Sequence, residues 1–470
     1  MTTHPGTSAP DASLVTPVLE ASEVGELRAD FRGSLLLAGD PGYEEGRRVW
    51  NASIDRHPAV IARCAGVEDV IRTVNFARER GLRVAVRGGG HNIAGNAVCD
   101  GGVVIDLSGM RSIRVDPARR TVRVEGGATW GELDRETHAV GHATTGGVVS
   151  TTGVGGLTLG GGIGWLARSY GLASDNLVSV DLVTADGERR TASATDDSDL
   201  FWGLRGGGGN FGVATSLEYR LHPVGQILGG LLIHPYGAAR DLLRFYREFT
   251  ASAPPALACF AVLGSSPDGQ PVAIVATCFN GPIAEGERLL RPLRTFGSPL
   301  VDGIGPMPYP ALQSMLDQAY PPGLFNYWKS AFLAALDDDA IDTMVAHAAE
   351  RPTPQCHLVI EQLGGEVSRL DPDATAFAHR HRPYNFLILG TSADRADLDA
   401  CTQWARQCWA AMQPSVAEGV YVNYIGTEGD EGSNRVREAY GAAKYERLAR
   451  LKARYDPTNL FRVNQNIGPA

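Results

Sequence analysis

The segment RGGGHNIAGNAV (Arg87–Val98) places three consecutive glycines directly before His91, and a fourth glycine follows four residues later. An ordinary turn explains three glycines poorly, because each glycine loses more backbone freedom on folding than any other residue. The segment therefore indicates a place where the main chain must stay bare, with His91 at its edge. The preceding run RVAVR (Arg83–Arg87) is typical of a strand, so we expect the glycines to form the loop that ends it.

Two further segments are dense in glycine: GGVVSTTGVGGLTLGGGIGWL (Gly146–Leu166) and RGGGGNFG (Arg205–Gly212). The first of these contains no charged residue, so it would bind a phosphate group through main-chain N–H groups and hydroxyls. The available hydroxyls are those of Ser150, Thr151 and Thr152. For all three glycine segments, the alternative is a tight turn in which two backbones pack closely.

The segment that begins at Arg205 also contains the pattern GxGxxG, at Gly207, Gly209 and Gly212. This pattern binds dinucleotides when a strand precedes it and a helix follows it. Here a strand-like run follows it, which argues against a Rossmann domain.

The overall composition argues against several classes of protein. The chain has 470 residues, enough for two or three domains, and 43% of them are hydrophobic. A formal net charge of −10 argues against a nucleic-acid partner, which needs a basic surface. No apolar run reaches the roughly 18 residues of a membrane-spanning helix, so no membrane partner is expected. The histidines show no HExxH or comparable spacing, which argues against a metal site.

The N-terminal residues and the cysteines bear on the cellular compartment. The first residues, MTTHPGTSAPDASLVTP, lack the basic and apolar regions of a secretory signal. The seven cysteines are scattered and include no CxxC pair, so we expect reduced, mostly buried thiols. Both observations predict a cytoplasmic protein.

The order of elements predicts an α+β fold. In the first half of the chain, DNLVSVDLVTADGERRTA (Asp175–Ala192) has the pattern of two strands joined by a hairpin turn at Asp186–Gly187. From about Gly225, strand-like runs come in succession and helical segments follow, which indicates a second domain. Near the C-terminus, VYVNYIG (420–426) is expected as a strand and REAYGAAKYERLARLKARY (437–455) as one helix.

Six pieces of the chain carry a family resemblance, and they occur in order between Tyr43 and Ile467. They are VRGGGHN, GGVVSTTGVGGLTLGGGIGWLARSYGLASDN, VTADG, DLFWGLRGGGGNFGVAT, YVNY and DPTNLFRVNQNI. Together they resemble the covalent-flavin oxidases of the berberine-bridge-enzyme type, within the vanillyl-alcohol oxidase superfamily. The resemblance implies four parts: an N-terminal lead at 1–39, partly disordered; a PCMH-type FAD-binding domain of two subdomains at 40–224; an inserted substrate-binding domain at 225–417, with an antiparallel sheet covered by helices; and a C-terminal segment at 418–470 that returns to the FAD domain.

The resemblance implies FAD as the cofactor, with His91 bonded to the 8α-methyl group of the flavin. Relatives with two covalent links carry a cysteine where this chain has Val149, so a single link is expected. The alternative for His91 is a loop histidine that only hydrogen-bonds to phosphate. The other cofactor contacts implied are Arg87, Gly88, Gly89, Gly90, Asn92, Gly147, Ser150, Thr151, Gly153, Gly155, Gly156 and Asn423.

Three residues match catalytic positions of the family. Tyr424 matches the catalytic tyrosine, and it would serve as a base only if its pKa of about 10 were lowered or its phenolate stabilised. Glu361, in the pattern ExxGG, matches a glutamate that is a base in some relatives and a substrate contact in others. An unpaired acid is costly to bury, so Glu361 is expected to face either solvent or a site. Thr152 is expected at the flavin edge, where its small side chain leaves access for oxygen.

Weaker expectations concern the substrate. Tyr327, Lys329 and Tyr421 are candidate substrate contacts, although a solvated position is the alternative for Lys329. His138 and His142 are expected to be structural.

The resulting hypothesis is a mono-covalent FAD oxidase. It would remove two electrons, as a hydride to flavin N5, from an alcohol, sugar, amine or natural-product intermediate, and pass them to oxygen to give hydrogen peroxide. Its partners would be a small-molecule substrate and molecular oxygen, while its oligomeric state is left open. The alternatives are a flavin dehydrogenase, an oxygenase that uses a flavin–oxygen adduct, and a non-catalytic flavin-binding protein.

Overall fold

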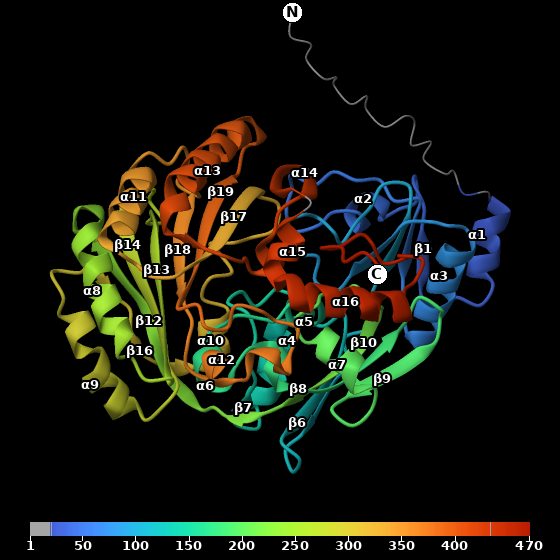
Figure 1. Cartoon of the computed structure of the whole chain (residues 1–470), viewed down its shortest axis with the longest axis horizontal. Coiled ribbons are helices and arrows are strands. Elements are labelled where there is room, and N and C mark those ends of the chain that lie inside the picture. The colour runs from blue at the N-terminus through green and yellow to red at the C-terminus, as the bar shows by residue number, and fades with distance from the viewer. Residues whose placement is uncertain (1–18, 20, 433) are drawn as a thin grey trace, which may run out of the picture.

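The protein is described by a computed structural model that covers residues 19, 21–432 and 434–470 (Figure 1). The expected disorder of the N-terminal lead falls mostly on residues outside this range. Within the lead, α1 (Ala21–Arg28) and β1 (Ser34–Leu36) are regular elements, and β1 pairs antiparallel with β2 (Val60–Arg63). The first sheet therefore begins before residue 40, where the resemblance placed the start of the FAD-binding domain.

Two sheets support the glycine segments. The first has the order β1-β2-β4-β3, with β2, β4 and β3 parallel, and α3 (Val67–Glu79) buries Val70 and Val74 against it. The second is antiparallel, with the order β5-β6-β10-β8-β9, and its β8–β9 pair confirms the predicted hairpin. The strands are β3 (Val84–Arg87), β4 (Val103–Asp106), β5 (Ile113–Asp116), β6 (Thr121–Glu125), β8 (Leu177–Val183), β9 (Arg189–Ser193) and β10 (Val213–Arg220). Shorter elements are α2 (Tyr43–Gly46), α4 (Trp130–His138), β7 (His142–Ala143), α5 (Val154–Leu159), α6 (Ala167–Tyr170), α7 (Ser198–Leu204) and β11 (His222–Pro223).

The second half of the chain forms a nine-stranded antiparallel sheet, which bears out the predicted α+β class. Its order is β15-β12-β14-β13-β18-β19-β17-β20, and β16 also pairs with β12. The strands are β12 (Gln226–Pro235), β13 (Leu257–Ser265), β14 (Pro271–Phe279), β15 (Val301–Asp302), β16 (Gly305–Pro308), β17 (Phe325–Leu333), β18 (His357–Gln362), β19 (Tyr384–Ser392) and β20 (Val416–Ala417). The helices are α8 (Ala239–Ala251), α9 (Ile283–Arg294), α10 (Tyr309–Gln313), α11 (Asp338–Ala349), α12 (Glu366–Arg369) and α13 (Leu398–Met412). Figure 1 shows α8, α11 and α13 along the side of this sheet that faces away from the two smaller sheets.

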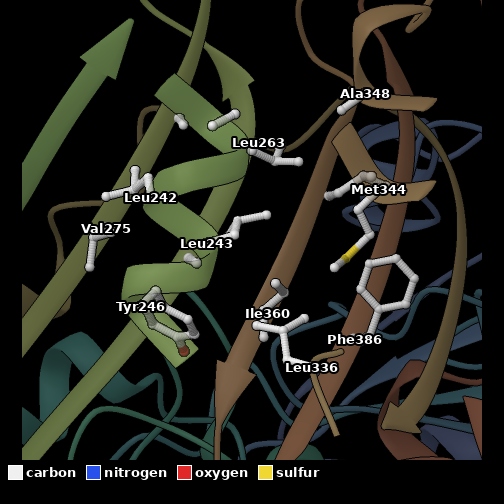
Figure 2. Packing of buried hydrophobic residues seen from close by; sticks show 14 of the residues in the cluster. Leu242, Leu243, Tyr246, Leu263, Val275, Leu336, Met344, Ala348, Ile360 and Phe386 are labelled. Carbon is white, nitrogen blue, oxygen red and sulfur yellow. The ribbon is translucent and has the colours of Figure 1, made fainter. Parts of the chain in front are cut away.

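Alternate residues of the large sheet face opposite sides, because successive side chains of a strand point in opposite directions. Leu263 and Ile360 point toward the helices, where they pack with residues such as Leu243 of α8 and Met344 of α11 (Figure 2). Their strand neighbours point the other way. We call this other side the inner face, and it carries Leu231, Ile233, Phe260, Val262, Ile274, Trp328, His357, Val359, Glu361, Leu387 and Leu389.

The C-terminal segment corrects two predictions. The run VYVNYIG is not a strand, because Val422–Tyr424 form a 3₁₀ turn. The predicted single helix is divided into α15 (Arg435–Tyr440) and α16 (Ala442–Tyr455), since Gly441 between them has a φ of +69°. Side chains of α16 and of the 3₁₀ turn share one hydrophobic cluster with β10 and α7 of the FAD-binding domain. Figure 1 shows α16 beside α7 and β10.

All seven cysteines are free and buried, as the sequence predicted. Among the residues that the structure describes, no helix combines the length and hydrophobicity needed to cross a bilayer.

Asp134 in α4 provides a stability prediction. It is fully buried, both carboxyl oxygens have no hydrogen-bond partner in the described part of the chain, and burial raises its pKa well above the usual value. A folded-state pKa above the unfolded one favours folding at low pH and weakens stability as the pH rises. We therefore expect Asp134→Asn to raise the melting temperature at pH 8 by about 2 °C or more, and to have little effect at pH 4. Asp241→Asn, at an exposed site of α8, is the control, and an equal change in both variants would contradict the prediction.

Candidate active site

A cavity of about 770 Å³ lies between the glycine segments and the inner face of the large sheet. One wall consists of the loops after β3 and before α5, and the opposite wall consists of inner-face side chains. The cavity therefore joins the region where main chain is exposed to the region where apolar side chains gather.

The first two glycine segments touch each other through their backbones. A Cβ atom on Gly89 would lie 2.3 Å from the main-chain nitrogen of Gly153, and one on Gly153 would lie 2.3 Å from that of Gly89. At these two positions the close-packing interpretation therefore applies. At Gly156 and at Gly209 of the third segment, a Cβ would meet no atom within 4 Å, so bare main chain faces the cavity there.

The loop after β3 leaves its main-chain donors free. In the part of the chain that the structure describes, the N–H groups of residues 88–92 donate to no other protein group. Runs of free N–H groups form concave sites that bind anions. At the far end of the cavity, Gly208–Asn210 and Asn464 join the lining, so a long anionic group would contact protein along its length.

His91 lies in the cavity wall between Trp50 and Thr151. The ring of Trp50 is stacked on it at a centroid distance of 5.4 Å, and its Nε2 lies 3.0 Å from the Thr151 hydroxyl. Burial lowers the pKa of His91 to about 4, so the imidazole is neutral near pH 7. The Nδ1 atom of His91 has no hydrogen-bond partner among the described residues, so it is available to form a bond.

Most of the predicted cofactor residues meet in this cavity. Its lining includes Gly88, Gly89, Gly90, His91, Asn92, Gly153, Gly155, Gly156 and Asn423. Arg87, Gly147, Ser150 and Thr151 are not among the lining residues. The hydroxyl and the N–H group of Ser150 both donate to Asp317, so this hydroxyl is directed away from a phosphate.

Glu361 of β18 is the acidic group on the inner face. Its side chain is buried, and its carboxylate accepts hydrogen bonds from Asn385 Nδ2 at 2.6 Å and from the Tyr424 hydroxyl at 3.0 Å. Burial raises the pKa of Glu361 to about 7, although these two donors oppose the shift. The carboxyl group can therefore both accept and release a proton near neutral pH.

Tyr424 lies beside Glu361 and also lines the cavity, as does Thr152. Burial raises the pKa of Tyr424 well above 10, and the neighbouring Glu361 adds to this shift. Of the two alternative conditions stated for a tyrosine base, a lowered pKa and a stabilised phenolate, the first is not met. Tyr424 instead donates its hydroxyl hydrogen to the Glu361 carboxylate.

Comparison with known proteins identifies the family. The model of the FAD binding domain matches residues 58–193, and the model described as berberine and berberine like matches residues 420–468. An FAD-linked oxidoreductase of Dictyostelium discoideum is 34% identical over 451 residues, which cover 95% of this chain and 97% of that protein. The chain belongs to the berberine-bridge-like FAD-linked oxidoreductases.

A curated relative and a solved structure, both named as 6-hydroxynicotine oxidases, support this assignment. The (R)-6-hydroxynicotine oxidase of Paenarthrobacter nicotinovorans is 30% identical over 93% of this chain and 97% of its own length. The crystal structure of 6-hydroxy-D-nicotine oxidase from Arthrobacter nicotinovorans superposes with a TM-score of 0.86 at 29% identity, covering 94% of this chain and 98% of that one. The protein is therefore an FAD-dependent oxidoreductase. The free N–H groups and bare glycines of the cavity fit the diphosphate of that cofactor.

Two predicted substrate contacts of this berberine-bridge-like protein lie away from the cavity. Tyr327 and Lys329 belong to β17, and both point toward the helix side of the sheet. The Lys329 ammonium lies 2.6 Å from Asp430 and 3.2 Å from Glu431, and Asp430 also accepts from the Tyr327 hydroxyl. Trp328, which lies between them in the strand, points to the inner face instead. The prediction therefore chose the residues on the wrong side of β17.

Tyr421 is also placed outside the lining. Its hydroxyl accepts hydrogen bonds from the N–H groups of Gly162 and Ile163 and from Asn423 Nδ2. It thereby connects the C-terminal 3₁₀ turn to the second glycine segment and holds Asn423 at the cavity. Neither His138 nor His142 lines the cavity, and His142 Nδ1 lies 2.8 Å from the Val140 carbonyl oxygen.

The sequence reasoning missed several lining residues of this oxidoreductase. They are Trp50, Tyr320, Trp328 and His357, whereas Gly209 belongs to the third glycine segment, whose role the sequence left open. His357 could have been found, because it shares the alternation of its strand with Glu361. Trp50 and Tyr320 lie in irregular segments, which have no periodicity to reveal their direction.

Proposed function

We propose that this protein is an FAD oxidase with a single covalent link through His91, acting on a small and largely apolar alcohol or amine. Bound FAD supplies the acceptor for the two electrons that leave the substrate as a hydride. Overall, the substrate loses two hydrogens to become a carbonyl compound or an imine, and oxygen takes them up as hydrogen peroxide. The observation that carries this proposal is the buried Glu361 carboxyl group, which faces the same cavity as the glycine segments.

Glu361 is proposed as the base that takes the O–H or N–H proton of the substrate. A catalytic base works best when its pKa lies near the working pH, and the pKa of Glu361 is about 7. Tyr424 and Asn385 donate hydrogen bonds to the carboxylate and fix its direction. We therefore propose Tyr424 as a positioning residue for this base.

His91 supports the covalent link in two ways. Its low pKa keeps a lone pair on the imidazole near pH 7, and the contact with Thr151 at Nε2 leaves Nδ1 free. In the net reaction, one methyl C–H bond and one imidazole N–H bond are replaced by one C–N bond, and oxygen takes the two hydrogens as hydrogen peroxide. Among the described residues, no cysteine lines the cavity and Val149 does, which supports a single link.

The inner face supports an apolar substrate. Apart from Ser265, the cavity-lining residues of β12, β13, β14 and β19 are Leu, Ile, Val, Phe and Ala. A sugar would lose its hydrogen bonds to water there without finding enough new partners, which is costly. Thr152 is small and lines the cavity beside the glycine segments, which supports oxygen as the electron acceptor. The unpaired buried cysteines support a reducing compartment such as the cytoplasm.

Anaerobic mixing with a compound panel tests the proposed function. Arylalkyl alcohols or amines are expected to bleach the yellow protein, whereas mono- and oligosaccharides are not. On admission of air, rapid reoxidation with one hydrogen peroxide per flavin is expected. Bleaching followed by slow reoxidation would indicate a dehydrogenase, and bleaching by sugars alone would contradict the apolar substrate.

A further inference from the structure

A second polar site lies on the inner face, where β18 begins, whereas Glu361 lies near the end of that strand. β18 contributes His357, Val359 and Glu361 to the cavity, at alternate positions of one strand. With a rise of about 3.4 Å per residue, His357 and Glu361 are separated by about 14 Å along the strand. Val359 lies between them, and Phe260 and Val262 of β13 line the same part of the cavity. The inner face therefore has two polar ends and an apolar middle.

His357 and Tyr320 form this second polar end. The Tyr320 hydroxyl lies 3.4 Å from His357 Nδ1, and the two rings meet edge to face at a centroid distance of 6.0 Å. Gly264 of β13 makes room for the imidazole, because a Cβ atom there would lie 2.6 Å from His357 Cδ2. Tyr320 is held in turn by Trp50, whose Nε1 donates to the Tyr320 carbonyl oxygen at 3.1 Å. Trp50 itself lines the cavity, so one lining residue holds the main chain of another.

The second polar end is uncharged. Burial and the nearby Arg351 lower the pKa of His357 to about 4, and burial raises the pKa of Tyr320 above its usual value. No lysine or arginine belongs to the cavity lining of the described residues. The nearby Arg351 lies outside this lining and donates hydrogen bonds to the Ser265 hydroxyl and the Ala348 carbonyl oxygen. A neutral hydroxyl or carbonyl group of a ligand would find hydrogen-bond partners at Tyr320 and His357.

We propose that Tyr320 and His357 bind a neutral hydroxyl or carbonyl group at the far end of the substrate, opposite the carbon that is oxidised. The substrate is then an elongated molecule with an apolar middle, oxidised at one end and hydrogen-bonded at the other. This inference rests on the proposed function, because Glu361 defines which end is oxidised. It identifies Tyr320 and His357 as specificity-determining residues.

A matched pair of probes tests the inference: 4-phenylbutylamine and its para-hydroxylated counterpart, 4-(4-aminobutyl)phenol. They differ only in one hydroxyl group, so their dissociation constants isolate that group. Binding to the intact flavoprotein is measured by calorimetry, which does not require turnover. The wild-type protein is expected to bind the hydroxylated probe about fivefold more tightly, the effect of one net hydrogen bond.

Variants assign this preference to the proposed residues. Tyr320→Phe and His357→Leu should each reduce the preference toward onefold while leaving the affinity for 4-phenylbutylamine nearly unchanged. Tyr236→Phe is the matched control, because it removes a phenolic hydroxyl that bonds to the Val345 carbonyl oxygen outside the cavity. Equal wild-type affinities for the two probes, no binding of either, or a preference that survives both variants would overturn the inference.

The same samples separate this inference from the proposed function. Anaerobic bleaching of the flavin reports oxidation, whereas the affinity ratio reports the second polar end. A hydroxylated probe that binds more tightly but bleaches nothing would contradict the proposed oxidation and support the polar end. Bleaching by both probes with equal affinities would support the proposed oxidation and contradict the polar end.

Discussion

Glu361→Gln is expected to slow the anaerobic reduction of the flavin by substrate at least about a hundredfold. Glutamine keeps the size of the side chain and one of its two acceptor oxygens, but it cannot take up a proton. The base is therefore removed together with the acceptor for one of the two donors, Asn385 or Tyr424. Stopped-flow absorbance of the flavin measures the rate directly. The substitution should not destabilise the fold. Because the pKa of Glu361 is raised in the folded protein, ionisation of this group lowers stability once the pH exceeds its pKa in the unfolded chain. A variant that reduces its flavin at the wild-type rate would exclude Glu361 as the base.

The pH dependence sharpens this test. In the wild-type protein, kcat/KM should rise with pH and reach half of its maximum near pH 7, because the base must be ionised. In Tyr424→Phe, the midpoint should move to higher pH, since the lost hydrogen bond favoured the ionised carboxylate. If Tyr424 were itself the base, Tyr424→Phe would instead remove the midpoint altogether.

His91→Ala is expected to abolish covalent attachment of FAD. Acid precipitation of the wild-type protein should leave a yellow pellet, and intact mass spectrometry should show the polypeptide plus one FAD. The variant should release all of its flavin into the supernatant, because no cysteine lines the cavity of the described chain to form another link. Both readouts are independent of turnover and of the substrate.

Substitution of another histidine controls for this experiment. His142→Ala changes a residue outside the cavity lining, and its flavin should remain attached. A wild-type protein that loses its flavin to acid, or a His91→Ala variant that keeps it, would disprove the link through His91.

The need for bare main chain in the glycine segments could be predicted from the sequence, because such a need appears directly as glycine. Gly89 and Gly153 are examples, since their backbones meet at a distance that no side chain permits. The phase of β17 could not be predicted. Both sides of the large sheet are apolar, one against helices and one against the cavity, so alternation alone does not show which residues face the site. The sequence therefore pointed to Tyr327 and Lys329 where Trp328 lines the cavity.

The prediction that VYVNYIG (420–426) forms a strand was wrong for a different reason. Its valine, tyrosine and isoleucine residues are typical of strands, but the environment overrides this preference. The Tyr421 hydroxyl accepts hydrogen bonds from two main-chain N–H groups of the second glycine segment, and Asn423 donates a hydrogen bond to the Leu157 carbonyl oxygen. These long-range contacts hold the turn in place, and they cannot be inferred from the local sequence.

The large sheet has a consequence for how such proteins diversify. Since neighbouring residues of one strand serve either helix packing or the cavity, mutations at inner-face positions leave the hydrophobic core beneath the helices intact. Selection can therefore retune ligand preference at Val262, Val359 or Leu389 while the scaffold keeps its melting temperature. A mutant library restricted to alternate codons of these strands would explore new chemistry with few misfolded members.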